Sequence, residues 1–531
     1  MERKYDKLFV GGDLSGIQKF LYNITSRKAA VSLKGRSGFL TQYLFQVCNK
    51  IEQSIEAAGD SDYVELYCSG GKFYLITKNL PSVIEAIDCC TKEITERLWE
   101  EHKGQLGINI SHIAFDEENN HFYVERHTDE EQTNSGILWK YLNADFARQK
   151  NQQFKELLVE KYDEFFEVQQ VGGKPKVCAV TGIESNDCRP LDDAKNIDED
   201  VENSEHLVFL PVVIKQIKLG IQLSKEQHLL NKLHKVKSFS DYADGSYLGI
   251  LRMDVDGLGK RFIIGFDTIE IYKQFSKKVK NFFENYIGGG NKDYKGERLL
   301  DEKDPETGMP YREFLNIIYA GGDDLFIVGR WDKLIEFAEK IHTKTVEHFK
   351  DDWYEEDITD RNGRSVRVKH FISISGGITI VKPKFPIAKA AELAGQAEEA
   401  AKQGEKNAFN MFGKTISWDK EFEKVKQYKN DFVQLIKDNL VSKSILHKLM
   451  LYSYIADTNK VCPPEKRTYS YVWHLSYFLA RYQKRYEGNK KVYDLCRRLN
   501  TLTANDRELE LVAVAARWAE LLSRDKTTNN D

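Results

Sequence analysis

The chain has 531 residues, a length typical of three or four domains. Its hydrophobic content of 41% excludes a disordered protein. The formal net charge of −4 argues against a protein that holds long nucleic acid by itself, since such proteins are more often basic. We find no secretory segment at the start and no apolar run of transmembrane length, so we expect a cytoplasmic protein without a membrane contact.

Residues 1–150 show strand, helix, hairpin and helix signals, and we expect one domain there. The string GGDLSGIQKFLY covers residues 11–22, and SLKGRSGFL covers residues 32–40. Residues 67–74, YCSGGKFY, have the pattern of two strands joined by a glycine turn. Residues 151–235 predict a smaller domain with a cysteine loop and the acidic loop 192–205.

A strand that starts at Tyr247 ends in the triplet Asp254-Val255-Asp256. Strand alternation puts Asp254 and Asp256 on the same side. The glycine-rich turn Gly257-Leu258-Gly259 then opens a helix, whose first N–H groups form a ready site for a polyphosphate.

Residues 316–328, NIIYAGGDDLFIV, predict a strand, a tight turn and a second strand. Gly321 and Gly322 suit the positive φ angles of such turns. Asp323 and Asp324 would be costly at the tip unless a cation lies there, and their hard oxygens suit Mg²⁺ or Mn²⁺. A solvated acidic turn is the alternative for this motif alone. Together with Asp254, it forms the carboxylate set of a two-metal nucleotidyl-transfer site.

Three later segments complete the chain. Residues 288–310 are rich in Gly, Lys and Asp and predict a flexible loop. Ser373 and Ser375 lie in a strand with small residues, which is also typical of a tightly packed central strand. From residue 421 onward, apolar residues recur at helical spacing.

Residues 254–259 and 321–324 resemble the palm domain of the polymerase/cyclase superfamily, which includes GGDEF-type diguanylate cyclases. Residues 11–22 and 32–40 resemble the first palm of the large polymerase subunit of type III CRISPR effector complexes, nearer the Csm than the Cmr branch. Residues 67–74 then occupy the hairpin position that GGDD takes in the second palm, without its carboxylates.

The resemblance implies an α+β fold with two ferredoxin-like palm domains. The predicted domains are a non-catalytic first palm at residues 1–150, a linking domain with a degenerate zinc-ribbon region at 151–235, a catalytic second palm at 236–420, and a C-terminal helical bundle at 421–531.

The zinc prediction concerns the cysteine loop. Relatives normally carry two Cys-x-x-Cys pairs here, whereas this chain has Cys178 and, at the return, only Cys188. A Cys₄ site needs four ligands, so zinc is doubtful and we expect this lobe to hold by packing. A retained site would need His206 or another outside ligand.

The resemblance also assigns roles to individual residues. The predicted catalytic residues are Asp254, Asp323 and Asp324, with Asp256 a weaker candidate, and the predicted ligands of the two divalent ions are Asp254, Val255, Asp323 and Asp324. The predicted nucleotide contacts are Gly257, Leu258, Gly259, Gly321, Gly322, Ser373, Ser375, and Lys402 or Lys406. The two lysines lie on a stretch that resembles the late helix of cyclases, and an ordinary amphipathic helix with exposed lysines is the alternative.

The implied activity is the conversion of ATP to cyclic oligoadenylate second messengers when the complex binds target RNA. One alternative is the transfer of AMP from ATP to another adenosine-containing metabolite, such as S-adenosylmethionine. A non-catalytic scaffold and a stand-alone cyclase are two further alternatives. The implied partners are the guide-cap-binding subunit, the small helical subunit, the guide RNA and the target RNA.

Many relatives begin with an HD-type nuclease domain. Here the palm motifs start near Met1, and no His-Asp dipeptide occurs in the chain. We therefore expect no DNA cleavage by this polypeptide.

Overall fold

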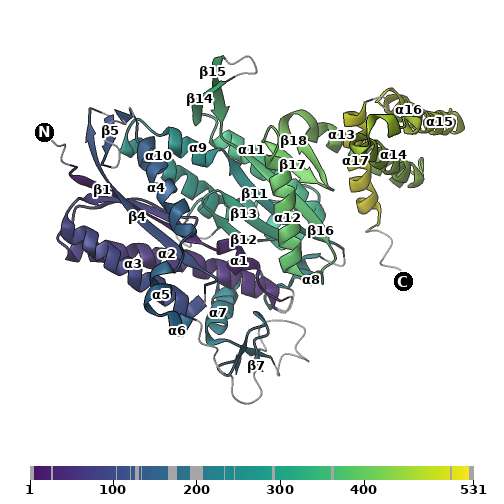
Figure 1. Cartoon of the computed structure of the whole chain (residues 1–531). Helices are drawn as coiled ribbons and strands as arrows, with labels where there is room; N and C mark the ends of the chain where they lie inside the picture. The colour runs from purple at the N-terminus through teal and green to yellow at the C-terminus, as the bar shows by residue number, and fades with distance from the viewer. Residues whose placement is uncertain are drawn as a thin grey trace. The chain divides into compact units, whose positions relative to one another are not determined.

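The computed structural model describes residues 5–25, 28–102, 104–119, 121–125, 131–132, 134–165, 176–191, 207–231, 234–243, 246–289, 294–359, 364–502 and 505–524. The chain divides into two compact units. The first consists of Met1–Ser373 and Ile380–Leu393, and the second of Ile374–Thr379 and Ala394–Asp531 (Figure 1). We describe each unit by itself, and the domain boundaries at residues 150, 235 and 420 stay predictions.

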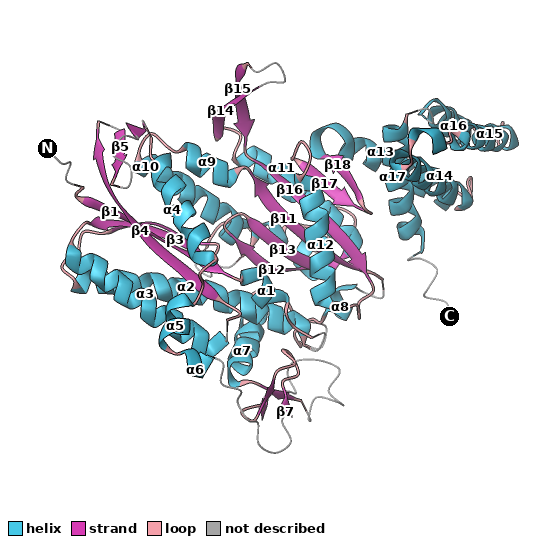
Figure 2. Cartoon of the chain, in the orientation of Figure 1, coloured by secondary structure: helices cyan, strands magenta, loops and turns pink. Residues whose placement is uncertain are grey.

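The first unit opens with a six-stranded sheet in the order β2-β3-β1-β4-β5-β6. Its strands are β1 (Lys7–Ser15), β2 (Val64–Ser69), β3 (Lys72–Lys78), β4 (Gly107–Glu118), β5 (His121–Val124) and β6 (Glu131–Gln132). The helices of this region are α1 (Ile17–Tyr22), α2 (Ala29–Ala57), α3 (Pro81–His102) and α4 (Gly136–Lys150). Strand β1 pairs antiparallel with both β3 and β4, which confirms the predicted strand, helix, hairpin and helix order (Figure 2).

A linking segment follows, and α7 anchors it to α2. Its elements are α5 (Lys155–Glu160), α6 (Tyr162–Phe165), β7 (Lys176–Val177), β8 (Glu184–Ser185), β9 (Arg189–Pro190), β10 (Val208–Phe209), α7 (Pro211–Glu226) and α8 (Phe239–Ala243). The two long helices cross at glycines, because a Cβ at Gly35 would lie 1.8 Å from the Gln216 carbonyl oxygen. Cys178 and Cys188 are fully buried here. The acidic loop 192–205 and His206 lie outside the described residues, so the loss of zinc stays a prediction.

The rest of the first unit repeats the topology of its beginning. Its elements are β11 (Leu248–Asp256), α9 (Leu258–Ile264), α10 (Ile269–Lys280), the π-helix η3 (Asn281–Ile287), the 3₁₀ helices η4 (Leu299–Asp301) and η5 (Tyr311–Glu313), β12 (Leu315–Gly321), β13 (Asp324–Arg330), α11 (Trp331–His348), β14 (Trp353–Thr359) and β15 (Ser365–Phe371). Strands β12, β13 and β11 are neighbours in that order, as β2, β3 and β1 are in the first sheet. The internal duplication suggested by the two glycine hairpins is thus a duplication of sheet topology.

The segment predicted as a flexible loop at residues 288–310 is anchored to the fold by a few buried residues of its described part. Leu299 is fully buried, and Asp304, also fully buried, lies 2.9 Å from the buried Nζ of Lys333 on α11. The backbone N–H and hydroxyl of Thr307 also donate to Asp304. The prediction was wrong for residues 299–310, because a buried ion pair fixes a segment whose composition is polar.

The second unit combines a small sheet with the C-terminal helices. Its elements are the 374–379 part of β16 (Ser373–Val381), the end of α12 (Ile387–Lys402), β17 (Ala408–Met411), β18 (Lys414–Ser417), η6 (Trp418–Phe422), α13 (Glu423–Lys437), α14 (Ser444–Val461), η7 (Pro464–Lys466), α15 (Ser470–Arg485), α16 (Lys490–Leu502) and α17 (Asp506–Arg524). Strand β16 pairs parallel with β17, and β17 pairs antiparallel with β18. The helical C-terminus and the α+β class are confirmed. Within the described residues, no helix is long and apolar enough to cross a membrane.

Candidate active site

The GGDD motif forms the tight turn between β12 and β13. Gly321 ends β12 and pairs with Asp324, the first residue of β13, so the turn consists of Gly322 and Asp323. Of the two glycines, only Gly322 has a positive φ, of 65°. The predicted strand, turn and strand are therefore present, but only one glycine is needed for the backbone conformation.

The hairpin lies beside the predicted carboxylates of β11. Asp254 pairs with Asp324 across the strands, and the backbone N–H of Val255 donates to the carbonyl oxygen of Asp323 at 3.1 Å. Asp256 is 5% exposed and accepts a hydrogen bond from the Ser373 hydroxyl at 2.8 Å. The structure thus brings together the acidic elements that the sequence proposed for one site.

Arg252 is a residue of this site that the sequence analysis did not select. Its Nη2 lies 3.8 Å from Oδ2 of Asp324, and its guanidinium lies 5.9 Å from the ring of Tyr22 on α1. It is only 8% exposed. Strand alternation places Arg252 on the same side as Asp254, so the pattern that selected the aspartates could also have selected this arginine. Its charge partly neutralises the hairpin carboxylates before any ligand binds.

Two tyrosines lie beside the hairpin, the buried Tyr319 of β12 and the partly buried Tyr67 of β2. Burial raises the pKa of Tyr319 well above its ordinary value, and the charges of Asp324 and Asp323 raise it further. Burial likewise raises the pKa of Tyr67. Both side chains therefore stay neutral phenols at physiological pH and can only act as hydrogen-bonding groups.

The two glycine hairpins meet directly. A Cβ at Gly70 of the first hairpin would lie 2.8 Å from the Cα of Gly322. The carboxylate-free hairpin therefore packs against the GGDD hairpin. This close approach leaves no room for a Cβ at Gly70 and makes one at Gly322 tight, at 3.3 Å from the Cα of Gly70.

The turn after β11 has the predicted form. Gly257 adopts φ 76° and precedes α9, which begins at Leu258. A Cβ at Gly257 would lie 2.6 Å from the Tyr354 hydroxyl oxygen, whereas nothing lies within 4 Å of one at Gly259. Lys260, near the start of α9, forms an ion pair with Glu356 at 2.9 Å. Phosphate binding by Gly257, Leu258 and Gly259 stays a prediction.

The three predicted aspartate ligands are chemically suited to bind divalent cations. Asp254, Asp323 and Asp324 supply hard carboxylate oxygens from adjacent strands, as Mg²⁺ and Mn²⁺ prefer. Within the described residues, however, their side chains do not form a group of three ligand atoms within 4.8 Å of one another. The backbone is therefore arranged for a shared site, and ion binding would draw the carboxylates together.

The remaining predicted contacts lie in the second unit. Ser375 is fully buried, and its hydroxyl accepts a hydrogen bond from the Ala408 N–H at 3.4 Å, an arrangement typical of a packed central strand. Lys402 ends α12 and pairs with Glu398 at 3.0 Å. Lys406 is exposed and has a positive φ of 58°. The choice between the two lysines stays open.

A cavity of about 810 Å³ lies in the first unit, next to β12. It is lined by α2, β2, α7, the continuous helical segment α10–η3, and β12, so both halves of the duplication contribute to it. Its basic lining residues are Lys34, Lys273, Lys277 and Lys280. The ammonium of Lys34 donates to the Ile317 carbonyl at 2.5 Å, and burial lowers its pKa to about 7. No motif had indicated this cavity, because its lining comes from five separate segments.

Replacing Gly322 by alanine is expected to lower the free energy of unfolding by about 1–2 kcal/mol, since the left-handed conformation is unfavourable for residues with a Cβ. The new Cβ would also lie 3.3 Å from the Cα of Gly70. Urea denaturation of the whole chain measures the change. Gly404→Ala is the matched control, because nothing lies within 4 Å of its Cβ position. Equal midpoints for the two variants would contradict the tight hairpin contact.

Comparison with known proteins matches family models to two segments of the chain. Residues 247–410 match the family model described as Cas10/Cmr2, second palm domain, and residues 7–170 match the model described as Csm1 subunit domain B. Both models describe parts of Cas10/Csm1-type proteins, and the matches confirm the resemblance to the large subunit of the Csm-like type III branch that the motifs showed.

Similar curated proteins carry the name CRISPR system single-strand-specific deoxyribonuclease Cas10/Csm1 (subtype III-A). The protein of Methanocaldococcus jannaschii is 25% identical over 512 residues, which cover 78% of this chain and 60% of that protein. The protein of Streptococcus thermophilus is 24% identical over 465 residues, which cover 76% of this chain and 53% of that protein. The chain thus spans little more than half the length of these relatives.

Solved structures support the fold. A Csm1-Csm4 cassette in complex with cA4 matches 97% of this chain and 70% of its own, with a TM-score of 0.61 and 18% identity. The match to the cassette in complex with pppApApA covers 98% of this chain and 70% of that one, with a TM-score of 0.62 and 17% identity.

Proposed function

We propose that this chain is the large subunit of a type III CRISPR interference complex that converts ATP to cyclic oligoadenylates when target RNA binds. The observation that carries the proposal is the pairing of the GGDD hairpin with Asp254 in a sheet that matches the second palm model. Csm1 proteins of the same fold have been crystallised with pppApApA and with cA4, a linear and a cyclic adenylate.

The roles of the hairpin residues follow from their positions. Asp254 and Asp323 would hold the divalent ions, together with Asp324 and the predicted ligand Val255. When bound, two such ions lower the pKa of an attacking ribose hydroxyl and offset the charge of the pyrophosphate leaving group. Arg252 holds Asp324 through an ion pair, which restricts that carboxylate before nucleotide binds. Ser373 fixes Asp256 by a hydrogen bond, so Asp256 orients the end of β11 rather than reaching the nucleotide.

The nucleotide would be steered by the chain's amides and lysines. The N–H groups that follow Gly257 suit the triphosphate, and Lys402 or Lys406 would add a positive charge. Catalysis then consists mostly of positioning and charge neutralisation, as is general for phosphoryl-type transfers. The Csm4 subunit and the guide and target RNAs are the partners that this proposal requires, with Csm4 named in the matching crystal structures.

The proposed activity is the nucleotidyl transfer at the GGDD hairpin and does not include DNA cleavage. The relatives carry the name of a deoxyribonuclease, but this chain matches only 53% to 61% of their lengths. Assembled complex incubated with labelled ATP and Mg²⁺ should consume ATP when matching target RNA is added and much less without it. Consumption that does not depend on RNA would favour a stand-alone cyclase. No consumption under either condition would favour a scaffold.

A further inference from the structure

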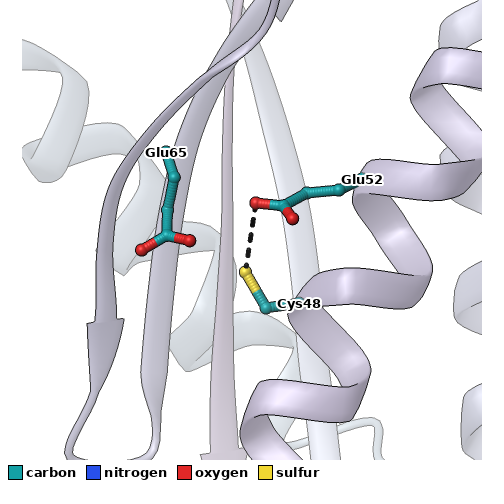
Figure 3. Close-up of side chains that lie close together, drawn as sticks. All are labelled: Cys48, Glu52 and Glu65. Atoms are coloured by element: carbon teal, nitrogen blue, oxygen red, sulfur yellow. Dashed lines mark hydrogen bonds between the residues drawn. The ribbon is translucent and has the colours of Figure 1, made fainter. Parts of the chain in front are cut away.

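Two thiols and two carboxylates face one another in the first half of the first unit, away from the GGDD hairpin. Cys48 and Glu52 lie one turn apart on α2, and Glu65 lies on the neighbouring strand β2 (Figure 3). Ligand atoms of these three residues all lie within 4.8 Å of one another. Within the described part of the chain, this is the group of three potential ligands that comes together.

A β-bulge supplies the fourth member. The register of β2 against β3 shifts between Glu65 and Tyr67. In a regular strand, residues three apart point to opposite faces, and the extra residue of a bulge reverses this relation. Glu65 and Cys68 therefore both face α2, and both interact with the Cys48 thiol. Cys68 thus lies beside Cys48, outside the 4.8 Å that the three ligand atoms share, and would complete a Cys₂Glu₂ set around an ion.

The separation between the Cys48 sulfur and a Glu52 oxygen suits a small tetrahedral ion. Zinc–sulfur and zinc–oxygen bonds of about 2.3 and 2.1 Å, at a tetrahedral angle, place sulfur and oxygen about 3.6 Å apart. The observed separation between Cys48 Sγ and Glu52 Oε1 is 3.7 Å, and the dashed line in Figure 3 marks it. Mixed thiolate and carboxylate ligands favour Zn²⁺, whereas the all-oxygen set at the GGDD hairpin favours Mg²⁺ or Mn²⁺.

Burial and access also fit an ion site. Cys48 and Cys68 are buried, Glu52 is half-buried and Glu65 is exposed, so an ion could enter from solvent at Glu65. Burial and the neighbouring charge of Glu65 raise the pKa of Glu52, and a bound cation would offset this unfavourable crowding. Glu52 also interacts with the Tyr63 hydroxyl, which would orient its carboxylate.

We infer that Cys48, Glu52, Glu65 and Cys68 form a structural site for a thiophilic divalent cation of the Zn²⁺ class. Such an ion would bind both thiols as thiolates, with release of their protons to solvent. It would tie β2 to α2 directly before the Gly70 hairpin, the segment that touches Gly322. The ion would therefore hold the first hairpin against the GGDD hairpin without taking part in its chemistry.

Titration of the metal-free whole chain with Co²⁺ tests this inference, because Co²⁺ bound by thiolates absorbs strongly in the near ultraviolet. We expect one equivalent to give this band and Zn²⁺ to displace it. Cys48→Ser should abolish the band, and Glu52→Gln with Glu65→Gln should weaken Co²⁺ binding by about 100-fold or more. Cys496→Ser removes a buried thiol elsewhere and should leave the titration unchanged.

A second thiol pair makes the experiment decisive. Cys178 and Cys188 also lie close to each other, so Cys178→Ser is measured in parallel. A band that survives Cys48→Ser but disappears in Cys178→Ser would overturn the assignment. So would the absence of any band at stoichiometric Co²⁺, or a Cys48–Cys68 disulfide in freshly purified protein. Far-ultraviolet circular dichroism of each variant excludes loss of the fold as the cause of a lost band.

Discussion

Alanine at both Asp323 and Asp324 is expected to lower nucleotide product formation by at least about a thousandfold, which corresponds to about 4 kcal/mol of transition-state stabilisation. The two side chains stand at the tip of the β12–β13 hairpin, next to Asp254. Their removal takes away hard oxygen ligands without opening a cavity in the core. Product formation from ATP is measured in assembled complex with target RNA, and assembly is checked by size-exclusion chromatography.

The matched control for this double variant is Asp351→Ala, which removes an exposed carboxylate that belongs to neither the hairpin nor β11. It should leave both activity and assembly unchanged. Asp254→Asn should reproduce most of the loss, because Asp254 is the carboxylate paired with Asp324 across the strands. Substantial product from the Asp323 and Asp324 double variant would refute the assignment of the catalytic site.

The replacement of Asp304 by alanine is expected to lower the free energy of unfolding by about 1.5–3 kcal/mol, because it removes the buried carboxylate that pairs with Lys333. The Lys333 ammonium keeps its ion pairs with the more exposed Glu306 and Glu336. Thermal and urea unfolding of the whole chain measure the loss. Asp301→Ala is the control, since Asp301 lies in the same segment but pairs with Arg312 at the exposed surface. Similar losses for the two variants would show that the buried pair does not fix this segment.

The same pair predicts a pH dependence. Burial alone would raise the pKa of Asp304, but hydrogen bonds from Thr307 and Lys333 outweigh it and lower the pKa from 3.8 to about 2. A carboxyl group with a depressed pKa in the folded state stabilises the fold above its unfolded pKa and loses this effect as pH falls. The stability difference between the native protein and Asp304→Asn should therefore be constant above about pH 5 and shrink between pH 4 and pH 2. A difference independent of pH over this range would contradict the shift.

Much of the candidate site could be predicted from sequence because its signals are local. Strand alternation placed Asp254 and Asp256 on one side, and the glycine turn placed Asp323 and Asp324 at a hairpin tip. The duplicated hairpin was visible as YCSGGKFY against YAGGDDLF. Each of these patterns spans fewer than about fifteen residues, the range over which backbone geometry alone fixes the arrangement.

The features that sequence reasoning missed depend on contacts between distant segments. The packing of residues 299–310 rests on Lys333, which lies on the following helix α11. The walls of the lysine-lined cavity come from α2, β2, α7, α10 with η3, and β12. The Cys₂Glu₂ cluster needs a bulge in β2, which no residue type announces. Arg252 is different, because the same alternation that selected Asp254 could have revealed it.

The central claim is that the GGDD hairpin makes cyclic oligoadenylate from ATP, and the mass of the product tests it most directly. Native complex and the Asp323 and Asp324 double variant are incubated side by side with ATP, Mg²⁺ and matching target RNA, with S-adenosylmethionine present in half of the samples. We predict a series of masses that are whole multiples of the AMP residue, without a terminal triphosphate, from the native complex only. A product that contains AMP joined to the added metabolite, or the same cyclic products from the double variant, would contradict the account.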